Sequence, residues 1–110
     1  MEKYFVTYKQ SVSLKELGFD EPCLGYYIAG QLLISNDIIY NSTDIPVIKA
    51  PLNQQAILFL LNKCDHLHGG ELSIEYFSDE SGILNNYGLP FKSIFEAIDK
   101  LIGLANDKIL

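Results

Sequence analysis

The sequence predicts an α+β fold in the order α-β-β-α-β-β-α, with an antiparallel sheet of about four strands and helices packed on one face of it. Two observations predict this class. Two pairs of short apolar segments each flank a turn signal, as in β-hairpins, and three longer segments repeat apolar residues at helical spacing. The 110 residues, 48% of them hydrophobic, fit one globular domain over 1–110.

The first helix is expected to begin at Thr7, because Thr7 and Gln10 have the spacing of a capping box. Gly18 stands where a helix commonly ends in a left-handed conformation, and Phe19 can then fold back onto the last turn. A later start gives a shorter helix and is the alternative, with the cap at Ser11 or Ser13.

A hairpin is expected next, formed by Leu24–Ile28 and Leu32–Ser35 around the turn Ala29-Gly30-Gln31. Because side chains alternate between the two faces of a strand, Tyr26 and Tyr27 point to opposite faces. One of the two rings is therefore expected to be exposed or to lie at an interface.

The stretch Asn36–Ala50 is rich in turn-forming residues and is expected to be irregular. The second helix is expected from Pro51 to about Lys63, since proline is tolerated at a first helical position. Its apolar residues predict a place at the centre of the core: Leu52, Ala56, Ile57, Phe59, Leu60 and Leu61.

The second hairpin is expected from Leu72–Phe77 and Ile83–Tyr87, with a turn at Asp79–Gly82. The last helix opens with another capping box, Ser93 to Glu96. Apolar residues then recur at helical spacing: Phe95, Ile98, Leu101, Ile102 and Ala105.

The charge balance excludes some classes of partner. Fourteen acidic residues and eight lysines, with no arginine, give a net charge of −6. A nucleic-acid groove and an anionic membrane surface both require a positive field, so neither partner is expected. The N-terminal residues contain no long apolar run, so a signal peptide is not expected, and the longest apolar run, Ala56–Leu61, is too short to span a bilayer. We therefore expect a cytoplasmic protein whose two cysteines are reduced thiols.

Three blocks of the sequence resemble a known family. They are Phe5–Tyr8 with Leu14–Cys23 and the following Tyr26-Tyr27, then Ala50–Leu52 with Gln54–Ala56, and last Phe95–Ala97. The blocks cover about half of the chain and are similar to a family of small uncharacterised proteins carried by phages and mobile elements of gut anaerobic bacteria. The family often has tryptophan and basic residues after the middle-helix alanine, where this chain has Ile57–Leu61. Because the family is uncharacterised, the resemblance implies an origin for the chain but no activity.

The segment Cys64-Asp65-His66-Leu67-His68 contains three side chains of metal-ligating type. In a strand, Cys64, His66 and His68 would share a face, whereas in a helix only Cys64 and His68 would. A cysteine nucleophile with a histidine partner is a related hypothesis. The simpler alternative is that polar residues complete the helix, where histidines are favoured near its negative end. No cofactor is expected.

Seven tyrosines in 110 residues favour a protein interface, because tyrosine combines contact area with a hydrogen-bonding group. No nucleotide-binding loop, nucleophile elbow or zinc-protease motif is present. The leading hypothesis is therefore a non-enzymatic protein-binding module, with Tyr26 and Tyr27 as binding residues and another protein, or a second copy in a homodimer, as partner. The alternatives are an acidic inhibitor that mimics nucleic acid and a metal or cysteine site centred on Cys64, His66 and His68.

Overall fold

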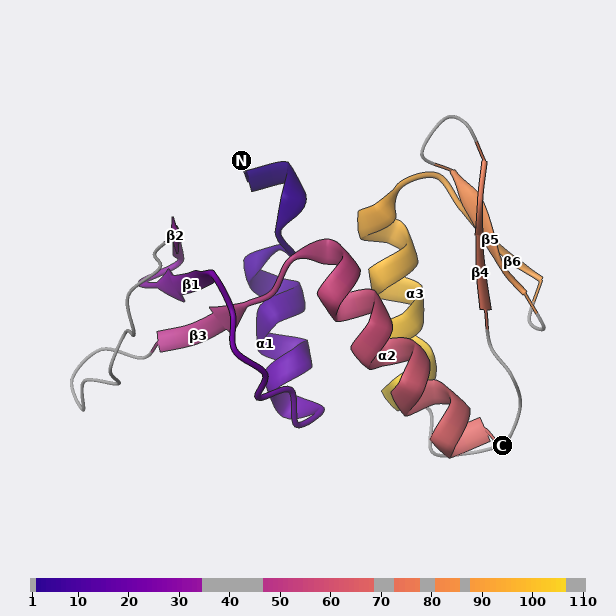
Figure 1. Ribbon diagram of the computed structural model, residues 1–110, viewed down its shortest axis with the longest axis horizontal. Coiled ribbons are helices and arrows are strands. Elements are labelled where there is room, and N and C mark those ends of the chain that lie inside the picture. Colours follow the sequence, from indigo (N-terminus) through magenta and orange to yellow (C-terminus); the bar gives the residue numbers. More distant parts are fainter. Residues whose placement is uncertain (1, 35–46, 69–72, 78–80, 86–87, 107–110) are drawn as a thin grey trace. The chain divides into compact units, whose positions relative to one another are not determined.

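The computed structural model describes residues 2–34, 47–68, 73–77, 81–85 and 88–106, and of residues 2 and 65–68 it describes the backbone alone (Figure 1). A short 3₁₀ helix at Glu2–Tyr4 precedes three α-helices, α1 (Tyr8–Glu16), α2 (Asn53–His68) and α3 (Ile94–Asn106). The strands are β1 (Gly25–Ile28), β2 (Gln31–Ile34), β3 (Val47–Ala50), β4 (Ser73–Tyr76), β5 (Gly82–Asn85) and β6 (Leu89–Phe91).

The α+β class, the three helices and the antiparallel pairing are confirmed. Over the described residues the order is α-β-β-β-α-β-β-β-α, and the six strands form two three-stranded sheets. The expectation of one sheet of about four strands is therefore wrong. It fails because β3 and β6 gain their strand conformation by pairing with strands that are already present, and neither has a strong strand pattern of its own.

The chain divides into two compact units, residues 1–56 and 57–110, with the boundary inside α2. Each unit contains one of the two sheets. The expectation of a single domain over 1–110 stays a prediction.

Helix α1 has the ends that its sequence predicts. Thr7 Oγ1 accepts a hydrogen bond from Gln10 N at 3.1 Å, and Gln10 Oε1 accepts one from Thr7 N at 3.0 Å. At the other end Phe19 N donates to Leu14 O at 2.9 Å, and Gly18 adopts a φ of 94°. These contacts complete a capping box and a Schellman motif, so the alternative start at Ser11 or Ser13 is wrong.

The first sheet has the strand order β2-β1-β3. The hairpin between β1 and β2 is confirmed, but its turn is shorter than expected, because Gln31 pairs with Ile28. The two turn residues, Ala29 and Gly30, have φ values of 52° and 80°. Ser35, the expected end of the second strand, lies outside the described residues. Two positive φ values are typical of a type I′ turn, whose twist matches that of the strands. Strand β3 pairs with the other side of β1, so part of the stretch that was expected to be irregular is a strand.

Helix α1 packs on one face of the first sheet, where it contacts β3 (Figure 1). Tyr27 belongs to this inner face: its hydroxyl donates to Val6 O at 2.8 Å, and its ring meets the ring of Tyr8 edge-on at 5.5 Å. Phe5 forms a bridge with Leu52 and is buried, as are several other apolar residues of the first unit: Val6, Leu14, Phe19, Ala50 and Ala56.

The second sheet has the order β4-β5-β6. The predicted hairpin is confirmed between β4 and β5, while Leu72, Asp79 and Tyr87 lie outside the described residues. Strand β6 was not expected, and Pro90 lies at its centre. Proline is tolerated there because β6 is an edge strand, which needs to donate hydrogen bonds on one side only.

Helix α3 contacts β6 (Figure 1), and it meets the second half of α2 where Cys64 Sγ donates to Leu101 O at 3.6 Å. It begins after Ser93, whose Oγ accepts a hydrogen bond from Glu96 N at 3.3 Å, as the second capping signal predicts. The Lys100 ammonium lies 3.3 Å from the Glu96 carboxylate and also donates to Pro90 O. The second unit buries these apolar residues: Ile57, Leu60, Cys64, Leu84, Phe91, Ala97, Ile98, Leu101, Ile102 and Ala105.

Helix α2 differs from its prediction at both ends. It begins at Asn53 and continues to His68, about one turn past the expected end at Lys63. The extension includes the segment of potential metal ligands. Within the part of the chain that the structure describes, no helix is both long and apolar enough to cross a membrane.

Candidate binding surface on the first sheet

The face of the first sheet opposite α1 is its outer face. Residues that pair directly across neighbouring strands share a face, and the pairings place six residues here: Tyr26, Ile28, Gln31, Leu33, Val47 and Lys49. Four of the six are apolar or aromatic. Leu33 remains 47% exposed, and Leu24, directly before β1, is 49% exposed. This sheet is therefore apolar on both faces.

The second sheet follows a different pattern. Leu84 and Phe91 are buried on one of its faces. The opposite face holds five residues, three of them polar: Ser73, Glu75, Ile83, Asn85 and Pro90. Asn85 Nδ2 donates to Ser73 Oγ at 3.2 Å on this face. Such alternation is typical of a sheet with one solvated face. The apolar outer face of the first sheet is therefore a property of that sheet and not of the chain in general.

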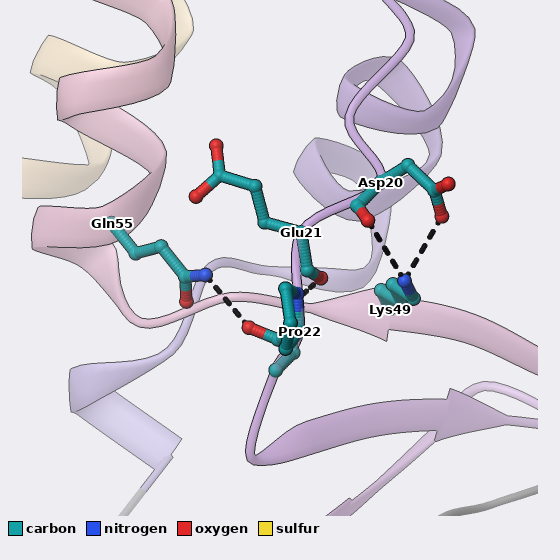
Figure 2. A network of polar contacts seen from close by, with 6 residues as sticks. Asp20, Glu21, Pro22, Lys49 and Gln55 are labelled. Atoms are coloured by element: carbon teal, nitrogen blue, oxygen red, sulfur yellow. Dashed lines mark hydrogen bonds and ion pairs between the residues drawn. The ribbon is translucent and has the colours of Figure 1, made fainter.

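The loop between α1 and β1 is held in place by two side chains (Figure 2). Lys49 Nζ donates to Asp20 Oδ1 at 2.9 Å and to Asp20 O at 3.1 Å. Gln55 Nε2 donates to Pro22 O at 2.9 Å, while the side chain of Glu21 points away from Lys49. The Asp20 carboxylate is 92% exposed, so this ion pair positions the loop but adds little stability. The Lys49 ammonium, which is the one charge among the six outer-face residues, is thus compensated by the Asp20 carboxylate.

Cys23 lies in the same loop and is half-buried. Its thiol donates to Glu21 O at 3.3 Å, which requires the protonated form. Burial raises the pKa of the Cys23 thiol to about 11, with Lys49 lowering it and Glu21 raising it further. A nucleophilic cysteine needs a lowered pKa, so Cys23 is poorly suited to covalent catalysis.

Cys64 is buried in α2, and its thiol donates to Leu101 O at 3.6 Å. The helical backbone excludes the strand geometry in which positions 64, 66 and 68 share a face. Positions 64 and 68 lie one turn apart, but the side chains of His66 and His68 lie outside the described residues. Among the described side chains no group of three potential metal ligands comes together.

Tyr26 and Tyr27 lie on opposite faces, as the alternation predicts, and both are half-buried. Their role in binding stays a prediction. Sequence reasoning missed Leu33 and Lys49, which both pair directly with Tyr26 on the outer face. The apolar run Leu32–Ile34 contained a signal, because its alternation with β1 assigns Leu33 to the face of Tyr26. No local signal existed for Lys49, since its strand was not predicted.

The chain was compared with protein-family models, with curated proteins and with solved structures, and none of them matches it. The resemblance to the family of phage and mobile-element proteins therefore stays a prediction.

Proposed function

We propose that this protein is a small, non-enzymatic protein-binding module that binds through the outer face of its first sheet, with Tyr26 at the centre of the contact. An origin in a phage or another mobile element follows from the resemblance of the sequence and belongs to the same proposal. One observation carries the binding function: apolar side chains occupy the outer face on all three strands, whereas the second sheet has a mostly polar face in the equivalent place. Contiguous apolar surface of this kind commonly marks protein interfaces.

Tyr26 supports this proposal because of where it lies. It occupies the central strand and pairs with Leu33 on one side and Lys49 on the other. An amphipathic ring in such a position brings a large contact area at low entropic cost. Tyr27 has a different environment, because its hydroxyl and its ring both contact residues of the first unit. We therefore expect Tyr26 to contribute to binding and Tyr27 to contribute mainly to folding.

The chemistry of the thiols supports a non-enzymatic function. The Cys23 thiol is protonated at neutral pH, since its pKa is about 11, and the buried Cys64 thiol donates to a backbone carbonyl. A metal site at Cys64, His66 and His68 and an inhibitor that mimics nucleic acid stay predictions, and no contact among the described side chains favours either of them.

A pull-down from a bacterial lysate tests the function, with bound proteins quantified by mass spectrometry. We expect wild type to enrich at least one protein that Tyr26→Ala and Leu33→Asp fail to enrich. The matched control is Glu75→Lys on the polar face of the second sheet, which should bind like wild type. Purified protein must then reproduce the interaction with the same variant pattern. Enrichment that is equal in all four proteins would contradict the proposal.

A further inference from the structure

The edges of the two sheets differ in how they are protected. An exposed edge strand offers unpaired backbone groups to another strand, and proteins usually block such edges with charges, proline or short length. Three of the four edge strands in the described part of the chain have such protection. Strand β3 carries Lys49, β4 carries Glu75, and β6 has three residues with Pro90 at its centre.

Strand β2 is the exception. Its sequence, Gln31-Leu32-Leu33-Ile34, contains no charge and no proline. It pairs with β1 on one side, and no described strand pairs with its other side. Leu33 and Ile34 nevertheless remain 47% and 43% exposed. An uncharged apolar edge of this kind favours the addition of a further strand.

We infer that β2 pairs in antiparallel orientation with β2 of a second copy of this chain, so that two first sheets join into one six-stranded sheet. The six strands follow from two three-stranded sheets, each with β2 at an edge. This inference rests on the proposed function, because it takes the outer face and its edge as the binding surface. It goes further by naming the occupant of the edge.

A second copy suits this edge because the strand is complementary to itself. A two-fold axis perpendicular to the sheet keeps each face continuous, so residues pair with residues of the same alternation. Leu33 then lies opposite the second Leu33, and Leu32 lies opposite the second Ile34. Every one of these pairs is apolar, and no like charges meet. This matters because the chain has a net charge of −6, which opposes the association of two copies wherever like charges meet.

The two outer faces would also become one continuous surface with two copies of Tyr26. Pairing of two four-residue strands buries less area than a standard stable interface. We therefore expect a weak dimer whose population depends strongly on protein concentration.

Sedimentation equilibrium of the full chain from about 10 µM to about 1 mM tests the inference, a range suited to weak association. We expect the mass of wild type to rise from 12.4 kDa toward twice that value, and Leu33→Lys to remain monomeric. Ser73→Lys, on the edge strand β4, is the matched control and should associate like wild type. Circular dichroism checks that each variant is folded, and Gln31→Lys replaces Leu33→Lys if the latter is not.

Disulfide trapping identifies the pairing itself. In a Cys23→Ser background, Leu33→Cys should form a cross-linked dimer under mild oxidation, because residues directly opposite in antiparallel strands have Cα atoms about 4.5–5.5 Å apart. Ser73→Cys in the same background should cross-link at least tenfold less.

A wild-type protein that stays monomeric at every concentration overturns the inference. In that case another protein or another part of the chain would cover β2. A dimer that Leu33→Lys leaves intact also overturns the inference. These failures are separate from failure of the proposed function. Capture of a partner that depends on Tyr26 by a strictly monomeric protein would overturn the second-copy inference alone. A dimer that captures no other protein would count against the proposed function alone.

Discussion

The ring of Phe5 lies against the backbone of Gly25 so closely that a Cβ atom on Gly25 would stand 2.7 Å from Phe5 Cε1 and 3.0 Å from Ala50 O. The glycine is needed for space, because its φ is not in the left-handed region. The contact joins the N-terminal segment to the central strand of the first sheet. It therefore fixes how the covered face of that sheet is packed.

Gly25→Ala should lower the free energy of unfolding by about 1–3 kcal/mol, since neither the buried ring nor the strand carbonyl can move without disturbing its neighbours. Chemical denaturation with circular dichroism measures this change. Gly103→Ala is the control, because a Cβ atom there meets nothing within 4 Å. Because Gly103 lies within α3, Gly103→Ala should raise the free energy of unfolding by up to about 1 kcal/mol. Equal effects of the two substitutions would contradict the close packing of the Phe5 ring against Gly25.

Ala29 occupies a left-handed conformation, with a φ of 52°, in the turn between β1 and β2. A side chain with a Cβ atom is strained there by about 1 kcal/mol. Ala29→Gly should therefore raise the melting temperature, and Gly30→Ala at the next position, with a φ of 80°, should lower it. Differential scanning calorimetry compares the two. A decrease for Ala29→Gly would show that the turn does not adopt the type I′ conformation.

Ser11 is 1% exposed, and its hydroxyl has no hydrogen-bond partner among the described residues. A buried hydroxyl without a partner destabilises the folded state. Ser11→Ala should thus stabilise the protein, by up to about 1 kcal/mol, because alanine also favours a helix.

Asn53→Ala provides the contrast to Ser11→Ala. Asn53 Nδ2 donates to Lys3 O at 2.8 Å, whereas its buried Oδ1 has no partner among the described residues, so losing the amide should cost up to about 1 kcal/mol. Urea titrations of the two variants, read by tyrosine fluorescence, measure both changes. Destabilisation by Ser11→Ala would mean that its hydroxyl is hydrogen-bonded in solution.

The Cys23 thiol should react slowly with alkylating reagents. Its pKa of about 11, against an ordinary value of 9.0, lowers the thiolate fraction at neutral pH about a hundredfold. Iodoacetamide labelling at pH 7.5, followed by peptide mapping, should modify Cys23 far more slowly in the folded protein than in urea. Labelling at the rate of a model thiol would rule out the raised pKa.

The same pKa shift predicts a pH dependence of stability. Because the pKa of the Cys23 thiol is raised in the folded state, the protonated thiol contributes fully to the free energy of unfolding below pH 9. This contribution is lost as the pH rises toward 11. Wild type should lose stability relative to Cys23→Ala over this interval. The difference between the two proteins removes the contributions of the other ionisable groups, which both proteins share.

The candidate surface was only partly predictable. The alternation of β1 identified Tyr26 and Tyr27 as members of opposite faces, but it did not say which face α1 would cover. Contacts of Tyr27 with Val6 and Tyr8 settle that, and both partners lie far from β1 in sequence. Lys49 was not recognised at all, because its neighbours did not predict a strand.

The sequence by itself determined the features that short-range contacts stabilise. Thr7 and Gln10 satisfy each other within one helical turn, and Gly18 with Phe19 ends α1 through bonds to the preceding turn. The hairpin of β1 and β2 likewise needs only its own turn. Such interactions involve residues a few positions apart, so their signals can be read from a short stretch of sequence.

Only the tertiary structure decided that β3 and β6 are strands and that the strands form two sheets. The backbone groups of β3 are satisfied by β1, more than twenty positions away for the pair Gly25 and Ala50. Strand β6 tolerates Pro90 because β5 pairs with it on one side. A strand is stable only when its hydrogen bonds are completed by another strand, and that partner is chosen by packing across the whole unit and not by local propensity.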